Sequence, residues 1–567
     1  MNSFYKRVPI LFSICLFLLL ADVPAQVFTP LSSGRYWITF TDKNNSPYLI
    51  ANPSAFLSPA ALSRRNKQNI PVAGSDLPVT PAYLDSLSAK GAKVLVRSRW
   101  LNGAMVDCDT SVLNLMQSLP FVLKTSAVNR RRKEPGIPPP FKTPDLISPF
   151  ADAYKTAEQT SFHSYNYGGS YGQVDMLGGV ALHDSGFGGQ GMVIAVLDGG
   201  FWKVDSLPAF DSLRAAGRIL GTWDFVAGDS SVFEDDTHGM YVLSVMAANE
   251  PGVMVGTAPG AAYWLLRTED PSSETLTEEY NWLAGAEFAD SVGADIINSS
   301  LGYSTFNNSL LNHSYADMDG NTTPVTIAAD MAAGKGMLVV NSAGNEGIAP
   351  WNFITAPADG DSVLAVGGVD AQRNYWNGSS KGPSSDGRVK PDVAAQGSSA
   401  VVASITGGTI PANGTSFAAP LVCGLAGCLW QAHPSLTCMH LLYAIQASAD
   451  KYSAPDTLTG YGIPNFTVAS MLLSGTDLNI FQSENIMGLF PNPSEGVFTL
   501  RFFSDTSQNI RIEIYDALGR IMLRDEKWVN TNSVNSISVN TENDAPGCYS
   551  LKITTARSQF TKKIIKI

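Results

Sequence analysis

The chain has 567 residues, 44% of them hydrophobic and 16% charged, with a formal net charge of −12 and an isoelectric point near 5.0. This composition is typical of folded globular domains, about three or four of them at this length, and it excludes a largely disordered chain. The acidic balance predicts that nucleic acid is not a partner.

The N-terminus has the pattern of a secretory signal peptide. Lys6 and Arg7 precede an apolar stretch from Val8 to Leu20, and small residues stand just before Gln26. We therefore expect a signal peptide over residues 1–25, with an uncleaved anchor as the alternative. Later apolar runs are short or broken by glycine and polar residues, so no other membrane span is expected.

Five cysteines remain once Cys15 leaves with the signal peptide, and an odd number leaves at least one thiol unpaired. Cys423 and Cys428 stand five apart in an expected helix, where their Cα atoms would be roughly 8 Å apart and too distant to bridge. Cys438 could reach one of them. The alternative is that all three are small buried apolar residues.

Residues 26–128 show a small α+β pattern. "YWITF", "KVLVRSRWL" and "FVLKTSAV" are predicted strands and "TSVLNLMQSL" a predicted helix. Residues 129–164 follow as a basic, proline-rich linker. Its basic run from Arg130 to Lys133 is either a solvated stretch or a processing site.

The pattern changes over residues 165–475. Apolar strands such as "MVIAVL", "ADIINSSLG", "GMLVVNSAG" and "SVLAVGGV" alternate with helical segments. This alternation predicts an α/β domain with a mostly parallel sheet and helices on both faces. Functional residues of such sheets lie at the carboxyl ends of the strands. A polar linker, 476–486, then precedes an expected all-β sandwich over 487–567.

Four polar residues fall where strands end or helices begin. Asp198 ends the strand "VIAVLD", His238 starts the helical segment "HGMYVLSVMAA", and Asn345 follows the strand "MLVVNS". Ser416 in "GTSFAAP" could be a turn residue, a helix N-cap or a nucleophile held at a helix N-terminus. Each residue alone has an ordinary structural explanation. Together they supply an acid, a base, an amide donor and a nucleophile.

The order of these four residues along the chain, and the segments around them, resemble the subtilisin-like serine peptidases. The matching segments are "VIAVLDGG", "HGMYVLSVMA", "SSLG", "SAGNEG" and "NGTSFAAPLVCGLAG". The resemblance implies a catalytic triad of Asp198, His238 and Ser416. A serine needs a neighbouring base to become a nucleophile, and the base needs an acid that fixes its tautomer.

The resemblance also implies the residues that hold the substrate. Asn345 would donate its amide to the oxyanion, together with the backbone N–H of Ser416. The substrate backbone would pair with one strand edge, and the side chain before the scissile bond would enter a pocket. The edge would be formed by Ser300, Leu301 and Gly302, and the pocket lined by Ser342, Ala343 and Gly344.

Three positions need comment. Gly199 and Met240 stand where many members of this family carry hydroxyl residues, which puts hydrogen bonds around the triad in doubt. Pro420 is expected in the first turn of the helix that begins near Ser416, where a missing N–H costs little.

No metal or cofactor is expected to be required. Many subtilisin-like peptidases bind calcium, and Asp317, Asp319 and Asn321 offer oxygen ligands in "YADMDGNT". The spacing does not fit an EF-hand loop, however, and an Asx-rich turn is the preferred interpretation.

The two ends of the chain carry further resemblances. Residues 26–128 resemble the inhibitory prosegments of the same family. The motifs "FPNPSEG", "IYDALGR", "GCYSLKI" and "KKIIKI" resemble the C-terminal sorting domain of the type IX secretion system. The alternative for the tail is a sandwich that binds carbohydrate or spaces domains.

The sequence therefore predicts a monomeric serine endopeptidase that acts on proteins or peptides, with its own prosegment as inhibitor. It would pass through the periplasm of a Gram-negative bacterium and, with the type IX machinery, become secreted or attached to the cell surface. An inactive binding protein on the same scaffold is one alternative. An esterase is another, but it would usually carry Gly-x-Ser-x-Gly.

Overall fold

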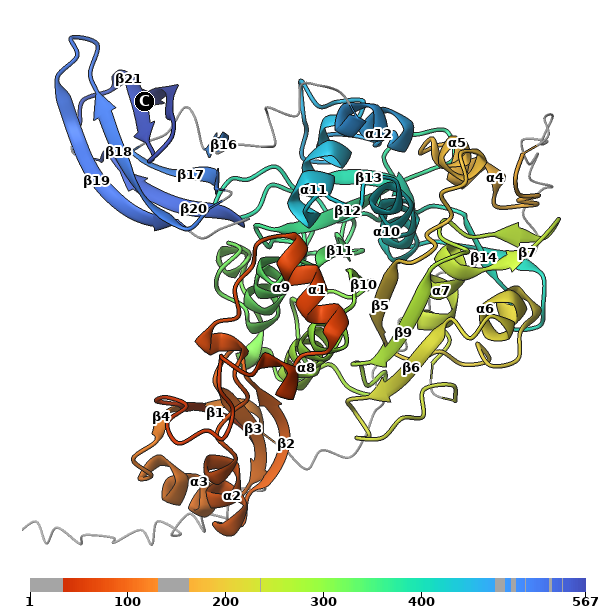
Figure 1. Ribbon diagram of the computed structural model, residues 1–567, viewed down its shortest axis with the longest axis horizontal. Helices are drawn as coiled ribbons and strands as arrows, with labels where there is room; N and C mark the ends of the chain where they lie inside the picture. Colours follow the sequence, from red (N-terminus) through yellow and green to blue (C-terminus); the bar gives the residue numbers. More distant parts are fainter. Residues whose placement is uncertain are drawn as a thin grey trace, which may run out of the picture.

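The computed structural model describes residues 34–130, 163–234, 236–474, 485–490, 496–504, 506–529, 533–542 and 544–566. The expected signal peptide, most of the linker after the prosegment and most of the linker before the tail lie outside these residues. Figure 1 shows an N-terminal α+β unit, a central α/β domain and a C-terminal β unit, in the order that the sequence predicts.

The N-terminal unit is a four-stranded antiparallel sheet in the order β2-β3-β1-β4, with helices α2 and α3 packed against one of its faces. Its core holds apolar residues such as Ile38, Val106 and Leu87. The elements are β1 (Gly34–Phe40), η1 (Pro53–Ala55), α1 (Pro59–Lys67), η2 (Gly74–Asp76), α2 (Pro81–Ala89), β2 (Lys93–Ser98), β3 (Gly103–Cys108), α3 (Thr110–Gln117) and β4 (Val122–Arg130).

The central domain contains a seven-stranded sheet in the order β13-β12-β11-β10-β5-β9-β6, and every neighbouring pair of these strands is parallel. This confirms the fold class expected from the alternation of apolar strands and helices. The strands of this sheet are β5 (Val193–Asp198), β6 (Ile219–Asp224), β9 (Ala262–Arg267), β10 (Ile296–Ser299), β11 (Leu338–Ser342), β12 (Val363–Val369) and β13 (Val393–Gln396).

Helices and short strands connect and cover this sheet. The helices are α4 (Tyr171–Asp175), α5 (Gly179–Asp184), η3 (Pro208–Phe210), α6 (Asp211–Ala215), α7 (His238–Ala247), α8 (Leu276–Val292), η4 (Ser309–Leu311), η5 (Tyr315–Asp317), α9 (Pro324–Gly334), α10 (Thr415–Ala432), α11 (Cys438–Ala447) and α12 (Phe466–Ser474). The short strands are β7 (Asn249–Glu250), β8 (Met254–Val255), β14 (Ala400–Ala403) and β15 (Thr409–Ala412).

Both faces of the sheet are covered because successive strand residues point to opposite sides. On β5, Ile194 and Val196 pack against α7 and α10, whereas Ala195 and Leu197 pack against α8. Helices α5, α7, α10, α11 and α12 share the first core, and α8 and α9 share the second. The second core also takes in apolar residues of the N-terminal sheet, which therefore lies over α8.

Helix α10 runs through the centre of the domain. Within the described residues it is the one helix long and apolar enough to cross a membrane, yet 89% of it is buried inside the domain, as in a core helix. It carries Cys423 and Cys428; these two, Cys438 and Cys108 are buried free thiols, and Cys548 is an exposed one. Burial raises the pKa of each of the three buried thiols near α10.

The C-terminal unit consists of two antiparallel sheets, β16-β17-β20 and β19-β18-β21-β22. Alternate residues from both sheets, among them Leu500, Ile512 and Leu551, form one apolar core, so the unit is a β-sandwich. Its strands are β16 (Asn485–Phe490), β17 (Val497–Ser504), β18 (Gln508–Tyr515), β19 (Ile521–Val529), β20 (Ser533–Asn540), β21 (Gly547–Thr554) and β22 (Gln559–Lys566).

Candidate active site

Asp198 and His238 form a hydrogen-bonded pair at the carboxyl edge of the sheet. Asp198 is the last residue of β5 and is fully buried, and its Oδ1 lies 2.7 Å from Nδ1 of His238, the first residue of α7. The two elements approach closely because residue 239 is a glycine: a Cβ there would lie 2.4 Å from the carbonyl oxygen of Gly200. The pair can fix the imidazole tautomer with Nδ1 protonated.

The second oxygen of Asp198 has an unusual environment. Gly199 donates its backbone N–H to Oδ1 at 2.8 Å, but Oδ2 is buried and has no hydrogen-bond partner among the described residues. Gly199 has no hydroxyl, and Met240 is fully buried in the apolar core. Within the described residues, one carboxylate oxygen of Asp198 is therefore held by no hydrogen bond.

Several nearby carboxylates raise the pKa of the His238 imidazole. Burial lowers the pKa of this imidazole, but the charge of Asp198 and its hydrogen bond outweigh burial, and Asp236 and Glu269 add to the rise. The resulting pKa is about 8. Burial also raises the pKa of Glu269 to about 8, against the effect of the hydrogen bond of 2.6 Å that it accepts from the Tyr303 hydroxyl.

Ser416 is the second residue of α10 and lies beside the strand edge that follows β10. Its Oγ donates to the carbonyl oxygen of Ser300 at 3.3 Å, and no hydrogen bond joins it to His238 within the described chain. The imidazole is nevertheless close to the start of α10, since its ring centroid lies 6.2 Å from that of Phe417. Catalytic hydrogen bonds are often long or poorly aligned before substrate binds.

The structure corrects the expected position of Pro420. Helix α10 begins at Thr415, so Pro420 is its sixth residue and lies inside the helix, not in the first turn. A proline there cannot donate to the carbonyl of Ser416. That carbonyl instead accepts a hydrogen bond of 2.8 Å from the Ser300 hydroxyl, which satisfies it and ties the helix to the strand edge.

Asn345 is exposed and has a fixed amide orientation. Its Oδ1 accepts hydrogen bonds from the backbone N–H of Thr415 at 2.9 Å and from the Thr415 hydroxyl at 3.0 Å. The backbone N–H can only donate, so the accepting atom must be the amide oxygen. The NH₂ group of Asn345 is therefore the end of the amide that remains available to donate.

The two strand edges named in the sequence lie next to each other. Asn341 of β11 donates its amide to the carbonyl of Leu301 at 3.0 Å, which holds the segment Ser300–Gly302 beside Ser342–Gly344. Thr355 lies between them: a Cβ at Gly302 would be 2.1 Å, and one at Gly344 2.8 Å, from its hydroxyl oxygen. Thr355 is buried, and its hydroxyl lacks a partner among the described residues.

Three residues that bear on this site were missed by the sequence analysis. Asp236 stands two positions before His238 in "EDDTHG", which is the one local signal that could have identified it. Glu269 follows β9, next to the strand that ends at Asp198, and Thr355 is in a loop with no recognisable motif. For these two, only the folded chain shows their proximity to the site.

The loop considered for calcium uses its carboxylates locally. Asp317 accepts from the backbone and hydroxyl of Ser314, and Asp319 accepts from the backbone N–H of Asn321 at 2.8 Å and the hydroxyl of Thr322 at 2.9 Å. These bonds form the Asx-rich turn. The described residues contain no group of three or more His, Cys, Asp or Glu side chains that could hold a metal ion.

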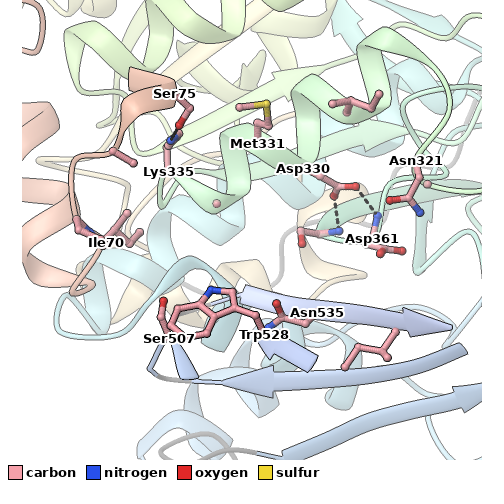
Figure 2. Close-up of a pocket in the computed structure, with 17 residues that line it drawn as sticks. Ile70, Ser75, Asn321, Asp330, Met331, Lys335, Asp361, Ser507, Trp528 and Asn535 are labelled. Atoms are coloured by element: carbon pink, nitrogen blue, oxygen red, sulfur yellow. Dashed lines mark hydrogen bonds between the residues drawn. The ribbon is translucent and has the colours of Figure 1, made fainter. Parts of the chain in front are cut away.

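A cavity of about 660 Å³ lies elsewhere, between the N-terminal unit, α9 and the β-sandwich (Figure 2). Ile70, Lys335 and Trp528 are among its lining residues, and Asp330 accepts hydrogen bonds there from the backbone N–H groups of Asp361 and Ser362. None of the candidate catalytic groups lines it.

The Asp–His pair at the carboxyl edge of the parallel sheet and the serine at the start of the central helix supply the residue types that an Asp/His/Ser hydrolase uses. The chain belongs to the subtilase family, whose pattern matches residues 189–462. Residues 35–137 match the Peptidase S8 propeptide domain of Bacteroidota, and residues 488–567 match the secretion system C-terminal sorting domain.

Characterised relatives agree with this assignment. Subtilisin E of Bacillus subtilis (strain 168) is 28% identical over 392 residues, which are 68% of this chain and 85% of the relative. Subtilisin of Bacillus pumilus is 30% identical over 303 residues, 52% of this chain and 97% of the relative. Thermitase of Thermoactinomyces vulgaris is 32% identical over 281 residues, 49% of this chain and 88% of the relative.

The chain is therefore a serine-type endopeptidase of the subtilisin type with a propeptide. Its C-terminal sorting domain implies secretion or attachment to the cell surface in Bacteroidota.

Proposed function

We propose that Asp198, His238 and Ser416 are the catalytic triad of this endopeptidase. The observation that carries the proposal is the Asp198–His238 hydrogen bond of 2.7 Å, placed beside the N-terminus of the helix that bears Ser416. The comparison of casein hydrolysis by the mature enzyme and by its Ser416→Ala variant tests it, and the variant is expected to lose nearly all activity.

In the proposed reaction, Nε2 of His238 takes the proton of the Ser416 hydroxyl while Oγ forms a bond to the substrate carbonyl carbon. The imidazolium, stabilised by Asp198, returns this proton to the leaving amine when the carbon–nitrogen bond breaks. Water then attacks the acyl-enzyme with His238 as base again, which releases the acid and restores the Ser416 hydroxyl.

Asn345 is proposed to donate its side-chain N–H to the oxyanion. Thr415 anchors the amide oxygen, so the NH₂ group is preorganised and does not have to rotate during the reaction. The backbone N–H of Ser416 at the start of α10 would be the second donor, aided by the positive end of the helix dipole.

The substrate is proposed to bind in an extended conformation. The segment Ser300–Gly302 would pair with its backbone, and Ser342–Gly344 would line the pocket for the side chain before the scissile bond. Thr355 fills the space between Gly302 and Gly344, so it would close the bottom of this pocket and limit its depth.

Thr355→Gly is therefore expected to deepen the pocket. The ratio of kcat/KM for a peptide with phenylalanine before the scissile bond to that for one with alanine should rise about tenfold or more, since each methylene of pocket space is worth ~1–3 kcal/mol. Thr355→Val is the matched control, because it keeps the volume and removes only the hydroxyl. Equal ratios in all three enzymes would place Thr355 outside the pocket.

The substitution Asp236→Asn is expected to move the acidic limb of the pH profile of kcat/KM to lower pH. The base must be neutral, so activity should rise with pH through the raised pKa of His238, about 8, and removing one negative charge lowers that pKa. Asparagine can still accept the hydrogen bonds of 2.6 Å and 3.3 Å from the backbone N–H groups of Thr237 and His238. A shift of about half a unit is expected.

Asp205→Asn serves as the control for this shift, because it removes the same charge from an exposed loop. If the pH profiles of the parent and of Asp236→Asn are identical, the acidic limb does not follow a His238 pKa that the charge of Asp236 raises.

The tail is proposed to direct export and to take no part in hydrolysis. Deleting residues 487–567 should leave a folded, active peptidase in lysates of a type IX-competent host and trap it in the periplasm, since a signal peptide serves only the inner membrane. Cell fractionation with an activity assay measures both effects. Normal appearance of the truncated enzyme outside the cell would rule out the sorting role, and inactive lysates would show that the sandwich supports the catalytic fold.

A further inference from the structure

The N-terminal unit contacts the catalytic domain through its antiparallel sheet with the β2–β3 loop, and through a segment inserted in the unit. The antiparallel sheet lies over α8, where Trp37 stacks on Tyr280 at 4.5 Å between ring centroids and Arg35 donates to the Thr277 hydroxyl at 3.2 Å. A second contact is made by residues 53–79, which contain η1, α1 and η2 and are inserted between β1 and α2. We call residues 53–79 the clamp.

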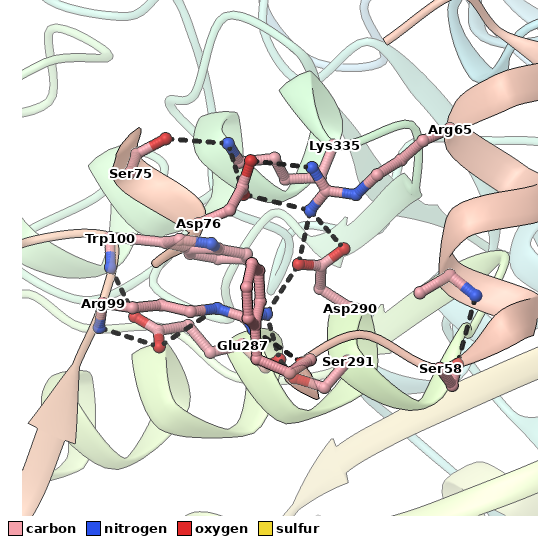
Figure 3. Close-up of polar contacts among 12 residues, drawn as sticks. Ser58, Arg65, Ser75, Asp76, Arg99, Trp100, Glu287, Asp290, Ser291 and Lys335 are labelled. Atoms are coloured by element: carbon pink, nitrogen blue, oxygen red, sulfur yellow. Dashed lines mark hydrogen bonds and ion pairs between the residues drawn. The ribbon is translucent and has the colours of Figure 1, made fainter. Parts of the chain in front are cut away.

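Arginines of the N-terminal unit converge on one buried carboxylate of α8 (Figure 3). Arg65 donates to Asp290 Oδ2 at 2.7 Å, Arg99 of the β2–β3 loop donates to the same oxygen at 2.7 Å, and Arg64 also pairs with Asp290. All four side chains are at most 7% exposed. Arginine–carboxylate bonds of this kind are charge-assisted and orientation-specific.

Two further carboxylates complete the network. Glu287 of α8 accepts from the backbone N–H groups of Arg99 and Trp100 at 3.0 Å each. In the second case the carboxylate is on the clamp and the cation on the catalytic domain: Asp76 accepts from Lys335 at 2.8 Å. Asp76 also accepts two hydrogen bonds of 3.1 Å from Arg65. Charges of both signs thus alternate across the contact, so that only one register matches them.

Uncharged hydrogen bonds and close packing also join the clamp to the backbone of the catalytic domain. Gln68 donates to the carbonyl of Gly336 at 2.7 Å and accepts from the backbone N–H of Cys438 at 3.0 Å, and so bridges two segments of the catalytic domain. Helix α1 lies directly on Gly293, where a Cβ would come within 2.4 Å of the Cβ of Ala60. This is close packing, comparable with a protein interior.

The clamp binds the edge of the sheet opposite to the candidate active site. Gly293 and Gly336 precede β10 and β11, which begin at Ile296 and Leu338. They therefore mark the amino ends of the strands, whereas Asp198, Ser300 and Asn345 lie at or after the carboxyl ends. Occupation of this edge does not require occupation of the substrate cleft.

We propose that the surface formed by Asp290, Lys335 and Gly336 is a retention site for the clamp, which keeps the prosegment bound after the linker that joins it to the catalytic domain is cut. Retention and inhibition are then separate properties of the prosegment. Retention depends on these binding contacts and not on which residues are catalytic.

The test uses the full chain carrying Ser416→Ala, with the cleavage sequence of a site-specific protease inserted in the linker between residues 131 and 162. The protein is immobilised through its C-terminal unit and cut, and release of the prosegment into buffer is followed over time. The parental protein is expected to retain it for hours. Release within minutes would overturn the proposal.

Arg65→Met and Gln68→Ala probe the clamp, and Arg35→Met is the matched control at the other contact. Loss of one partner of a buried charge pair acts mainly on dissociation, so Arg65→Met should release the prosegment roughly a hundredfold faster or more. Gln68→Ala, which removes no charge, should release it about tenfold faster. Arg35→Met should stay within about threefold of the parent, because its contact is partly exposed.

Thermal unfolding of each uncut protein shows which variants have the parental fold before release is compared. Parental release rates in both Arg65→Met and Gln68→Ala would contradict the proposal, as would faster release in Arg35→Met than in either of them. Because Gln68→Ala disturbs only two hydrogen bonds, it keeps the test decisive if Arg65→Met fails to fold.

Discussion

Replacing Ser416 by alanine is expected to lower kcat for peptide hydrolysis by about a million-fold, the loss known for the serine of subtilisin. Alanine removes the oxygen that we propose forms the acyl-enzyme, while the small side chain fits the first turn of α10 without strain. The Oγ bond to the carbonyl of Ser300 is long, at 3.3 Å, so its loss should cost little stability. Casein hydrolysis and a chromogenic peptide measure the effect.

His238→Ala should lose about as much activity, and the double variant hardly more, because the two groups act as a unit. Ser435→Ala, an exposed serine between α10 and α11, is the control and should keep parental activity. Unfolding temperatures near the parental value would show that the losses are chemical. Parental casein hydrolysis by Ser416→Ala would end the assignment of the nucleophile.

Asn345→Ala is expected to lower kcat by ~10²–10³ with little change in KM, the magnitude known for the oxyanion-hole asparagine of subtilisin. The reason lies in the anchored amide: its oxygen is held by Thr415, so its N–H can act on charge that exists only in the transition state. Steady-state kinetics on a short peptide separate kcat from KM.

Asn345→Asp distinguishes donation from anchoring. Aspartate keeps the oxygen that accepts from Thr415, but it replaces the donor with a negative charge beside the developing oxyanion. We expect it to lose at least as much activity as Asn345→Ala. An active Asn345→Asp enzyme, or a rise in KM at unchanged kcat in either variant, would make Asn345 an anchoring or ground-state binding residue.

Much of the fold could be predicted from sequence because the signals are local. Apolar runs such as "MVIAVL" between amphipathic helices allow little other than a covered parallel sheet. In such a sheet a polar residue at a strand end is placed at the carboxyl edge, which locates Asp198, Ser300 and Asn345 before any coordinate is known. The order of the candidate site residues along the chain then indicated the resemblance to subtilisin-like serine peptidases.

What the sequence did not reveal depends on contacts between distant segments. The sequence predicts Pro420 in the first turn because it does not fix the start of α10 to within a few residues. The carbonyl of Ser416, which Pro420 leaves without a helical donor, accepts its hydrogen bond from the Ser300 hydroxyl, more than a hundred residues away. Thr355 gains its position only when two strand edges meet.

The clamp shows the same limit for charged residues. Arg64 and Arg65 occur in the sequence "LSRRNK", which is typical of a solvated helix face. They are buried because Asp290 and Asp76 are brought to them from opposite sides of the contact, and nothing in either local sequence records this pairing.

Covalent labelling shows whether Ser416 is a nucleophile activated by His238 and Asp198. An aryl sulfonyl fluoride forms a bond from sulfur to an activated serine oxygen and loses fluoride, and peptide mass spectrometry locates the adduct. We expect one adduct per mature enzyme, on Ser416, with loss of activity in proportion to labelling, and very slow labelling of the His238→Ala variant. Stoichiometric labelling of another residue, or full activity with Ser416 labelled, would contradict it.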